Sequence, residues 1–217
     1  MTLVVAAPSR NFLVLGADSR GTVQDSGGAR VEMNQMKKIV PLAKHVAVLL
    51  YGAADQGVYL ARKFLPANRN IDGVTKAAEK FADFCRDEIR KVSDVPRQYF
   101  PLFGFIVAGL DRRGNSYSIP ACYRFDSASG CMLGSPDPYA IAGKPFIAQY
   151  LFEQRYAENM GVDELCALVA QCIYDTICVD GDVGGRIRVA IVDEVGFRER
   201  PFKHVKASIK QWGEPLV

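Results

Sequence analysis

The 217-residue chain has only two histidines and no pair of cysteines with the Cys-x-x-Cys spacing. Neither His45 nor His204 lies in a pattern of serine, cysteine or acidic residues that predicts a histidine-dependent hydrolase or a metal site. We therefore expect no metal and no cofactor. In a reducing compartment the six cysteines are predicted to be small buried hydrophobic residues rather than a disulfide or zinc framework.

The sequence also lacks long runs of like charge and long runs of apolar residues. No run of five like charges occurs, and 27 basic residues against 24 acidic ones leave a formal net charge of +3, which disfavours nucleic acid or a membrane surface as the main partner. The longest apolar run, near 102–110, is far shorter than the roughly 18 residues of a membrane-spanning helix. The amino terminus lacks the charged region and cleavage site of a signal peptide, so we expect a cytoplasmic protein.

The composition is that of a globular chain, with 49% hydrophobic and 24% charged residues. This length supports one large core, and we predict a single domain over residues 1–217. The expected strands and helices come in separate runs rather than in strict alternation, a pattern typical of an α+β fold.

The apolar periodicity gives the expected elements. Strands are predicted at 3–7, 12–15, 37–40, 45–50, 102–110, 116–123 and 186–192, and helices at 53–66, 72–89, 145–156 and 162–178. Asp72 is expected to cap its helix, 23–32 to be an irregular excursion, and 111–115 to be a turn. Because one helix pair follows the first strands and another follows the later ones, we predict two antiparallel sheets packed face to face with a helix pair outside each.

Thr2 directly follows the initiator methionine and opens the first predicted strand. Because methionine aminopeptidase accepts a small second residue, removal of Met1 would leave a threonine that carries both a hydroxyl and a free α-amine. A hydroxyl beside its own base is an activated nucleophile. The ordinary pKa of an α-amine is about 7.7–8.0, so a nearby cation that lowers it would keep the amine largely neutral at pH 7.

Further motifs accompany this threonine in a characteristic order and spacing. They are Gly16-Ala17-Asp18-Ser19-Arg20-Gly21-Thr22, Lys37-Lys38-Ile39, Tyr51-Gly52-Ala53-Ala54-Asp55, Tyr99-Phe100-Pro101, Ala108-Gly109-Leu110-Asp111 and Val162-Asp163-Glu164. Over nearly the whole chain they resemble the proteasome β-subunits of the N-terminal-nucleophile hydrolases, and look closest to the bacterial homologues. The resemblance implies a four-layer αββα sandwich.

The resemblance also assigns catalytic roles. Thr2 would be nucleophile and base together, and Lys38 the buried ammonium that lowers the pKa values of its amine and hydroxyl. Asp18 would hold Lys38 charged and in place. The backbone N–H of Gly52, at a strand-to-helix junction, would stabilise the oxyanion. Asp180 matches the later aspartate of the family's site.

A substrate-binding groove follows from the same resemblance. Backbone groups of Gly21 and Thr22 would hold an extended peptide that binds as an added strand. The first specificity pocket would be uncharged, and would therefore favour apolar side chains before the cleaved bond. Its lining residues would be Met36, Val40, Leu50 and Ala54, with Gly21 at the rim.

Two positions depart from the family pattern. Lys144 stands where the family has a serine beside the threonine amine, and Val183 stands where it has a second serine just past Asp180. In the family those serines help to orient the amine and its water. We therefore expect activity, but slower than that of a typical member.

Three functions are compatible with these residues. The first is an N-terminal threonine peptidase subunit of a self-compartmentalising bacterial protease, which cleaves peptides or unfolded polypeptides inside homo-oligomeric stacked rings. A double heptamer is the expected assembly, with six-fold rings as the alternative and the existence of an ATPase partner left open. The second is a weak or inactive ring subunit that serves as a scaffold or binding chamber. The third is a non-peptide amidase with the same nucleophile.

Overall fold

The computed structural model describes residues 2–24, 30–68, 70–91, 102–201 and 203–205. Its strands are β1 (Leu3–Pro8), β2 (Leu13–Ala17), β3 (Gly21–Gln24), β4 (Arg30–Met33), β5 (Ile39–Ala43), β6 (Val46–Gly52), β7 (Phe103–Arg113), β8 (Ser116–Asp126), β9 (Ala140–Gly143), β10 (Arg188–Asp193) and β11 (Gly196–Glu199). Its helices are α1 (Ala54–Phe64), the 3₁₀ turn η1 (Leu65–Ala67), α2 (Val74–Lys91), α3 (Phe146–Arg155) and α4 (Val162–Val179).

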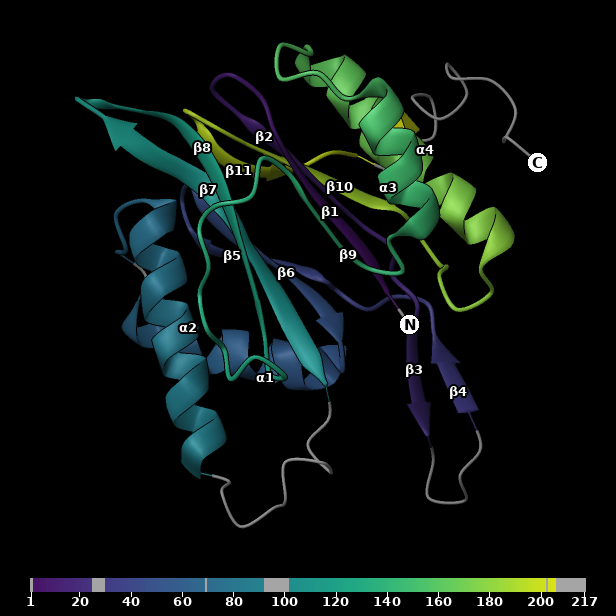
Figure 1. The fold of residues 1–217 in the computed structure, drawn as a ribbon, viewed down its shortest axis with the longest axis horizontal. Helices are drawn as coiled ribbons and strands as arrows, with labels where there is room; N and C mark the ends of the chain where they lie inside the picture. The colour runs from purple at the N-terminus through teal and green to yellow at the C-terminus, as the bar shows by residue number, and fades with distance from the viewer. Residues whose placement is uncertain (1, 25–29, 69, 92–101, 202, 206–217) are drawn as a thin grey trace.

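Two antiparallel sheets form the centre of the molecule (Figure 1). One has the strand order β11-β10-β2-β1-β9 and is covered by α3 and α4, and the other has the order β5-β6-β7-β8 and is covered by α1 and α2. Strands β3 and β4 form a separate hairpin beyond the sheets. The layers therefore run helix, sheet, sheet, helix, which confirms the predicted αββα sandwich.

Strand β1 shows why the first residues of the chain form a central strand. Successive side chains of a strand point to opposite faces. Val4 and Ala6 pack in the apolar layer between the two sheets, whereas Leu3, Val5 and Ala7 pack against α3 and α4. Both faces are covered, so an uninterrupted apolar sequence is required here.

A glycine sets the distance between β2 and α4. A Cβ added to Gly16 would lie 2.3 Å from Cγ1 of Val169. Only a residue without a side chain lets the helix approach the sheet this closely. The close contact fixes the distance between the middle of α4 and the sheet.

All the predicted helices and long strands are present, and the errors concern short elements. Strands β9 and β11 and the β3–β4 hairpin were not predicted, because four-residue strands are too short to show a periodicity. The turn predicted at 111–115 is present but shorter, at 114–115, since β7 continues to Arg113 and pairs with Ser116. Five cysteines are buried and Cys178 is exposed. Within the described residues, no helix combines the length and hydropathy needed to cross a membrane.

The start of α2 is capped by a residue from another element. The Asp111 carboxylate, from β7, accepts hydrogen bonds from the backbone N–H of Thr75 at 3.1 Å and from its hydroxyl at 2.5 Å. The carboxylate of Asp72 instead accepts a hydrogen bond from Tyr117 and pairs with Arg112. The predicted cap at Asp72 is therefore replaced by a tertiary contact.

Candidate active site

Thr2 immediately precedes β1, with only 3% of its surface exposed. Its carbonyl oxygen accepts a hydrogen bond from the backbone N–H of Lys144 at 2.9 Å. Gly143, which precedes Lys144 and ends β9, has a φ of +99°, and a Cβ there would lie 1.8 Å from the Thr2 carbonyl oxygen. A residue with a side chain would be strained and would collide with Thr2. The end of β9 therefore holds the Thr2 backbone in one position.

A fully buried ion pair lies next to the start of β1. Lys38 Nζ is 2.7 Å from Asp18 Oδ1, and both side chains are 0% exposed. Asp18 Oδ1 also accepts the N–H of Leu3 at 2.9 Å, while Oδ2 accepts the N–H groups of Arg20 and Gly184, each at 3.2 Å. A buried carboxylate is tolerated only when it is paired and hydrogen-bonded in this way. Through Leu3, the ion pair is attached directly to the residue after Thr2.

The environment of Lys38 alters its acidity. Burial lowers the pKa of the Lys38 ammonium from its ordinary value of 10.5, and the charge and hydrogen bond of Asp18 oppose part of this effect. Lysines with lowered pKa values next to a specific charged partner are typical of catalytic sites, although structural ion pairs show the same effect. What distinguishes this pair is its attachment to the amino-terminal strand.

Gly52 ends β6 two residues before α1 begins at Ala54. Its φ of +76° and the 2.3 Å that would separate a Cβ from the Leu102 carbonyl oxygen both require glycine. Two residues earlier, Leu50 donates its N–H to the Lys38 carbonyl at 2.9 Å. The strand that carries Gly52 is thus bonded to the strand segment that carries Lys38.

Asp180 follows α4, and both of its carboxylate oxygens are engaged. Oδ1 accepts the N–H of Asp182 at 2.9 Å, and Oδ2 is 3.2 Å from Lys144 Nζ. Lys144 Nζ also lies 3.7 Å from Asp182 Oδ2. Val183 is 1% exposed and packs in the cluster beneath α4. Of the two departures from the family pattern, one is therefore an ion-pair partner of Asp180 and the other is a core residue.

The predicted groove residues are only partly gathered. Gly21, in β3, lies against Met36, since an added Cβ would be 2.6 Å from Met36 Cε. Val40 is half-buried and packs on the cluster beneath α1 and α2, and Leu50 is fully buried within that cluster. Thr22 pairs with Glu32 of β4, and Ala54 opens α1. The structure thus brings Gly21 and Met36 together and leaves Leu50 without exposed surface.

Sequence reasoning missed two glycines that organise the site. Gly184 donates to Asp18 and its carbonyl accepts the N–H groups of Ser19 at 3.1 Å and Arg20 at 2.8 Å. Gly143 determines where the Thr2 carbonyl can lie. Both occur in short glycine-containing segments that predict only turns. Their contacts link residues far apart in the sequence, and no local pattern reveals them.

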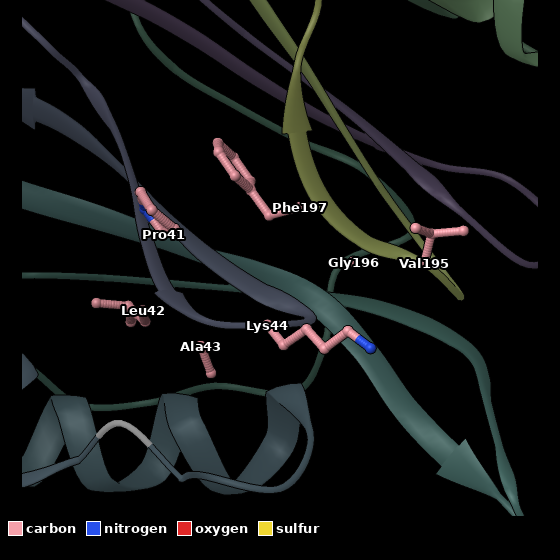
Figure 2. A pocket seen from close by; sticks show the side chains of 7 residues that line it. All are labelled: Pro41, Leu42, Ala43, Lys44, Val195, Gly196 and Phe197. Atoms are coloured by element: carbon pink, nitrogen blue, oxygen red, sulfur yellow. The ribbon is translucent and has the colours of Figure 1, made fainter.

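A hollow of about 430 Å³ lies elsewhere, between the β5–β6 turn and the β10–β11 hairpin (Figure 2). Its lining consists of Pro41, Leu42, Ala43, Lys44, Val195, Gly196 and Phe197. The two walls are joined by the hydrogen bond from Phe197 N–H to the Lys44 carbonyl at 2.7 Å. Lys44 is the only charged side chain in this lining, which shares no residue with the predicted site.

Comparison with known proteins gives consistent matches. The family described as "Proteasome subunit" matches residues 2–192. The proteasome subunit beta of Archaeoglobus profundus is 25% identical over 91% of this chain and 87% of its own length. The proteasome subunit beta type-6 of Arabidopsis thaliana is 28% identical, covering 99% of this chain and 86% of its own length. The proteasome subunit beta type-1 of Saccharomyces cerevisiae is 25% identical over 90% of this chain and 85% of its own length.

Proposed function

The chain belongs to the proteasome subunit family, and from this premise we propose that it is an N-terminal threonine peptidase that cleaves peptide bonds inside a ring chamber. The observation that carries the proposal is the buried Lys38–Asp18 pair, bonded to Leu3 N–H immediately after Thr2. A scaffold has no need of a charged pair in its core, because well-packed hydrophobic residues are often at least as stabilising. The matched relatives above are archaeal and eukaryotic, so the bacterial placement stays a prediction.

The proposed reaction uses groups from several elements. After removal of Met1, the Thr2 amine takes the proton of the Thr2 hydroxyl, and the hydroxyl oxygen attacks the peptide carbonyl. The positive charge of Lys38 lowers the pKa values of both groups. The Gly52 N–H stabilises the tetrahedral oxyanion. The amine of the substrate leaves with the proton that the Thr2 amine had taken up, and an ester on the Thr2 hydroxyl remains. Water then hydrolyses this ester, with the Thr2 amine again acting as base.

For the assembly, we extend the proposal to homo-oligomeric rings stacked as a double heptamer, built from one domain per chain. Phe146 and Tyr150 lie one turn apart on the outer helix α3 and are 84% and 63% exposed. Large apolar side chains gathered on an outer face are typical of subunit contacts. Enclosure in a ring would keep the site away from folded proteins and admit unfolded polypeptides or peptides.

Covalent labelling tests the function directly. We expect an epoxyketone or β-lactone inhibitor to add one inhibitor mass to the chain, and peptide mapping to locate it on Thr2. The preparation must first be shown by intact mass to lack Met1, because a retained methionine blocks the amine. Chains without Met1 that form neither an adduct nor hydrolysis products would contradict the peptidase proposal and favour the inactive scaffold. Adducts without cleavage of any peptide, but with cleavage of small amides, would favour the amidase.

The proposed pocket predicts the substrate preference. Gly21, Met36 and Val40 carry no charge, and each methylene that a substrate buries there contributes about 0.8 kcal/mol. Fluorogenic peptides ending in Leu or Tyr should therefore have a higher kcat/KM than matched peptides ending in Arg or Glu. A clear preference for either charged peptide would show that the pocket assignment is wrong.

A further inference from the structure

We propose that Lys144 is a positioning residue whose ammonium holds the turn at 180–184 against the buried ion pair. The inference rests on the proposed function for its kinetic consequence. Its structural part, a tether between β9 and the turn, stands on the contacts alone.

Lys144 connects two segments of the site through different atoms. Its backbone N–H donates to the Thr2 carbonyl at 2.9 Å, while its side chain reaches Asp180 at 3.2 Å and Asp182 at 3.7 Å. One positive charge thus meets two negative ones. The three side chains are 27%, 25% and 25% exposed, so the cluster is partly accessible to water and salt.

The turn that these carboxylates belong to is folded back on itself. Asp182 N–H donates to the Asp180 carboxylate at 2.9 Å, and Val183 N–H donates to the Asp180 carbonyl at 3.1 Å. The Arg20 guanidinium also donates to the Gly181 carbonyl at 2.6 Å. The turn is therefore held by contacts with both Lys144 and Arg20.

The last residue of the turn supports the ion pair. Gly184 donates its N–H to Asp18 Oδ2 at 3.2 Å, and Asp18 Oδ1 binds Lys38 Nζ at 2.7 Å. A shift of the turn would therefore change a hydrogen bond of Asp18. Lys144 therefore acts on Thr2 through the turn and Asp18, which is bonded to Leu3 N–H. It has no need to touch the substrate. The Lys144 ammonium is itself paired with the carboxylates of Asp180 and Asp182.

The test uses three variants of the full-length, Met1-free protein. Lys144→Met removes the charge but keeps the backbone N–H to Thr2, Lys144→Arg keeps the charge, and Lys63→Met removes an unrelated ion pair to Glu88 on the outer helices. Small displacements of reacting groups cost up to about 100-fold in rate, and we expect Lys144→Met to lower kcat by about ten-fold with KM unchanged. Lys144→Arg should recover most of the rate, and Lys63→Met should retain all of it.

Salt gives an independent readout. The Debye length falls from about 10 Å at 0.1 M salt to about 3 Å at 1 M, which screens a partly exposed cluster. Wild-type and Lys63→Met activity should therefore fall between these concentrations, and Lys144→Met activity should not. An active protein in which Lys144→Met keeps the wild-type kcat at low salt, or in which Lys144→Arg fails to recover the rate, would overturn the positioning role.

Hydrogen exchange separates this inference from the proposed function. Exchange in the peptide covering 180–184 should be faster in Lys144→Met than in wild type, whether or not the protein hydrolyses anything. Equal exchange would overturn the tether. A wild-type protein with no Thr2 adduct and no hydrolysis, but with the expected difference in exchange, would refute the peptidase and leave the tether standing.

Discussion

Thr2→Ala should abolish peptide hydrolysis while leaving the assembled protein intact. Loss of a hydrolase nucleophile that acts together with its base lowers kcat on the order of 10⁶-fold, so the residual rate should be at the limit of detection. Thr2→Ser keeps both a hydroxyl and an α-amine and should retain a clearly measurable rate. The comparison requires purified protein of verified mass, in which the amino-terminal residue is position 2 in every variant.

The control for Thr2→Ala is a hydroxyl at the far end of the same strand. Ser9 is 5% exposed, and its single hydroxyl proton is shared between the carbonyls of Glu158 and Met160, whose oxygens lie 2.9 and 3.0 Å from Ser9 Oγ. Ser9→Ala should lower the free energy of unfolding by about 1 kcal/mol, because a buried hydrogen bond is lost, yet keep the wild-type rate. Light scattering on all preparations checks that ring size is unchanged. Wild-type activity in Thr2→Ala would falsify the mechanism.

How far the sequence predicted the fold depended on the length of each element. Strand β1 is apolar throughout and buried on both faces, and helix α4 has one wide buried apolar stripe. The bounds of both elements were predicted within a residue or two. Strand β9 has only four residues, and its position beside β1 follows from long-range pairing. Periodicity carries no information on such a contact, so the strand that positions Thr2 was missed.

For the site as well, some residues could be predicted from the sequence and others could not. Thr2 was selected from its position after Met1, whereas Asp18, Lys38 and Gly52 were selected by resemblance. The structure brings Asp18 and Lys38 into contact and bonds them to the start of β1. The supports of that pair could not be predicted, since Gly184 is 166 positions from Asp18. Likewise, the sequence shows a lysine in place of a serine at position 144 but not the carboxylates that bind it. Chemistry-bearing residues are visible locally, whereas the contacts that orient them depend on the folded chain.

Removing the Lys38 charge should have the second large effect. Breaking a buried ion pair by removing one partner costs about 3–5 kcal/mol of stability, because the remaining charge is buried without compensation. Lys38→Met should therefore lower the free energy of unfolding by this amount. Its activity should fall by about 100-fold or more even at temperatures where the protein stays folded, because the Thr2 amine loses the cation that adjusts its proton affinity.

In the wild-type protein, we expect rising pH to change activity and stability in opposite directions. Burial lowers the Lys38 pKa below 10.5. As the pH rises through this lowered pKa, the folded chain loses the ammonium, and hydrolysis should decline. Between the lowered pKa and 10.5 the unfolded chain binds a proton that the folded chain does not, so the contribution of Lys38 to stability should rise with pH across the same window. Activity profiles and urea unfolding at matched pH values measure the two trends.

A double variant distinguishes a catalytic ion pair from a purely structural one. Lys38→Met combined with Asp18→Asn removes both charges, so the cost of an unpaired buried charge disappears. The double variant should be more stable than the sum of the two single losses predicts, by about 0.5–3 kcal/mol, the usual coupling between groups in one network. Recovery is incomplete because an asparagine amide cannot accept hydrogen bonds at both of the positions that bind Leu3, Arg20 and Gly184. Hydrolysis should stay lost, since no cation is restored beside Thr2. If activity returned together with stability, the pair would serve only to fold the chain, and the role assigned to Lys38 in the reaction would be wrong.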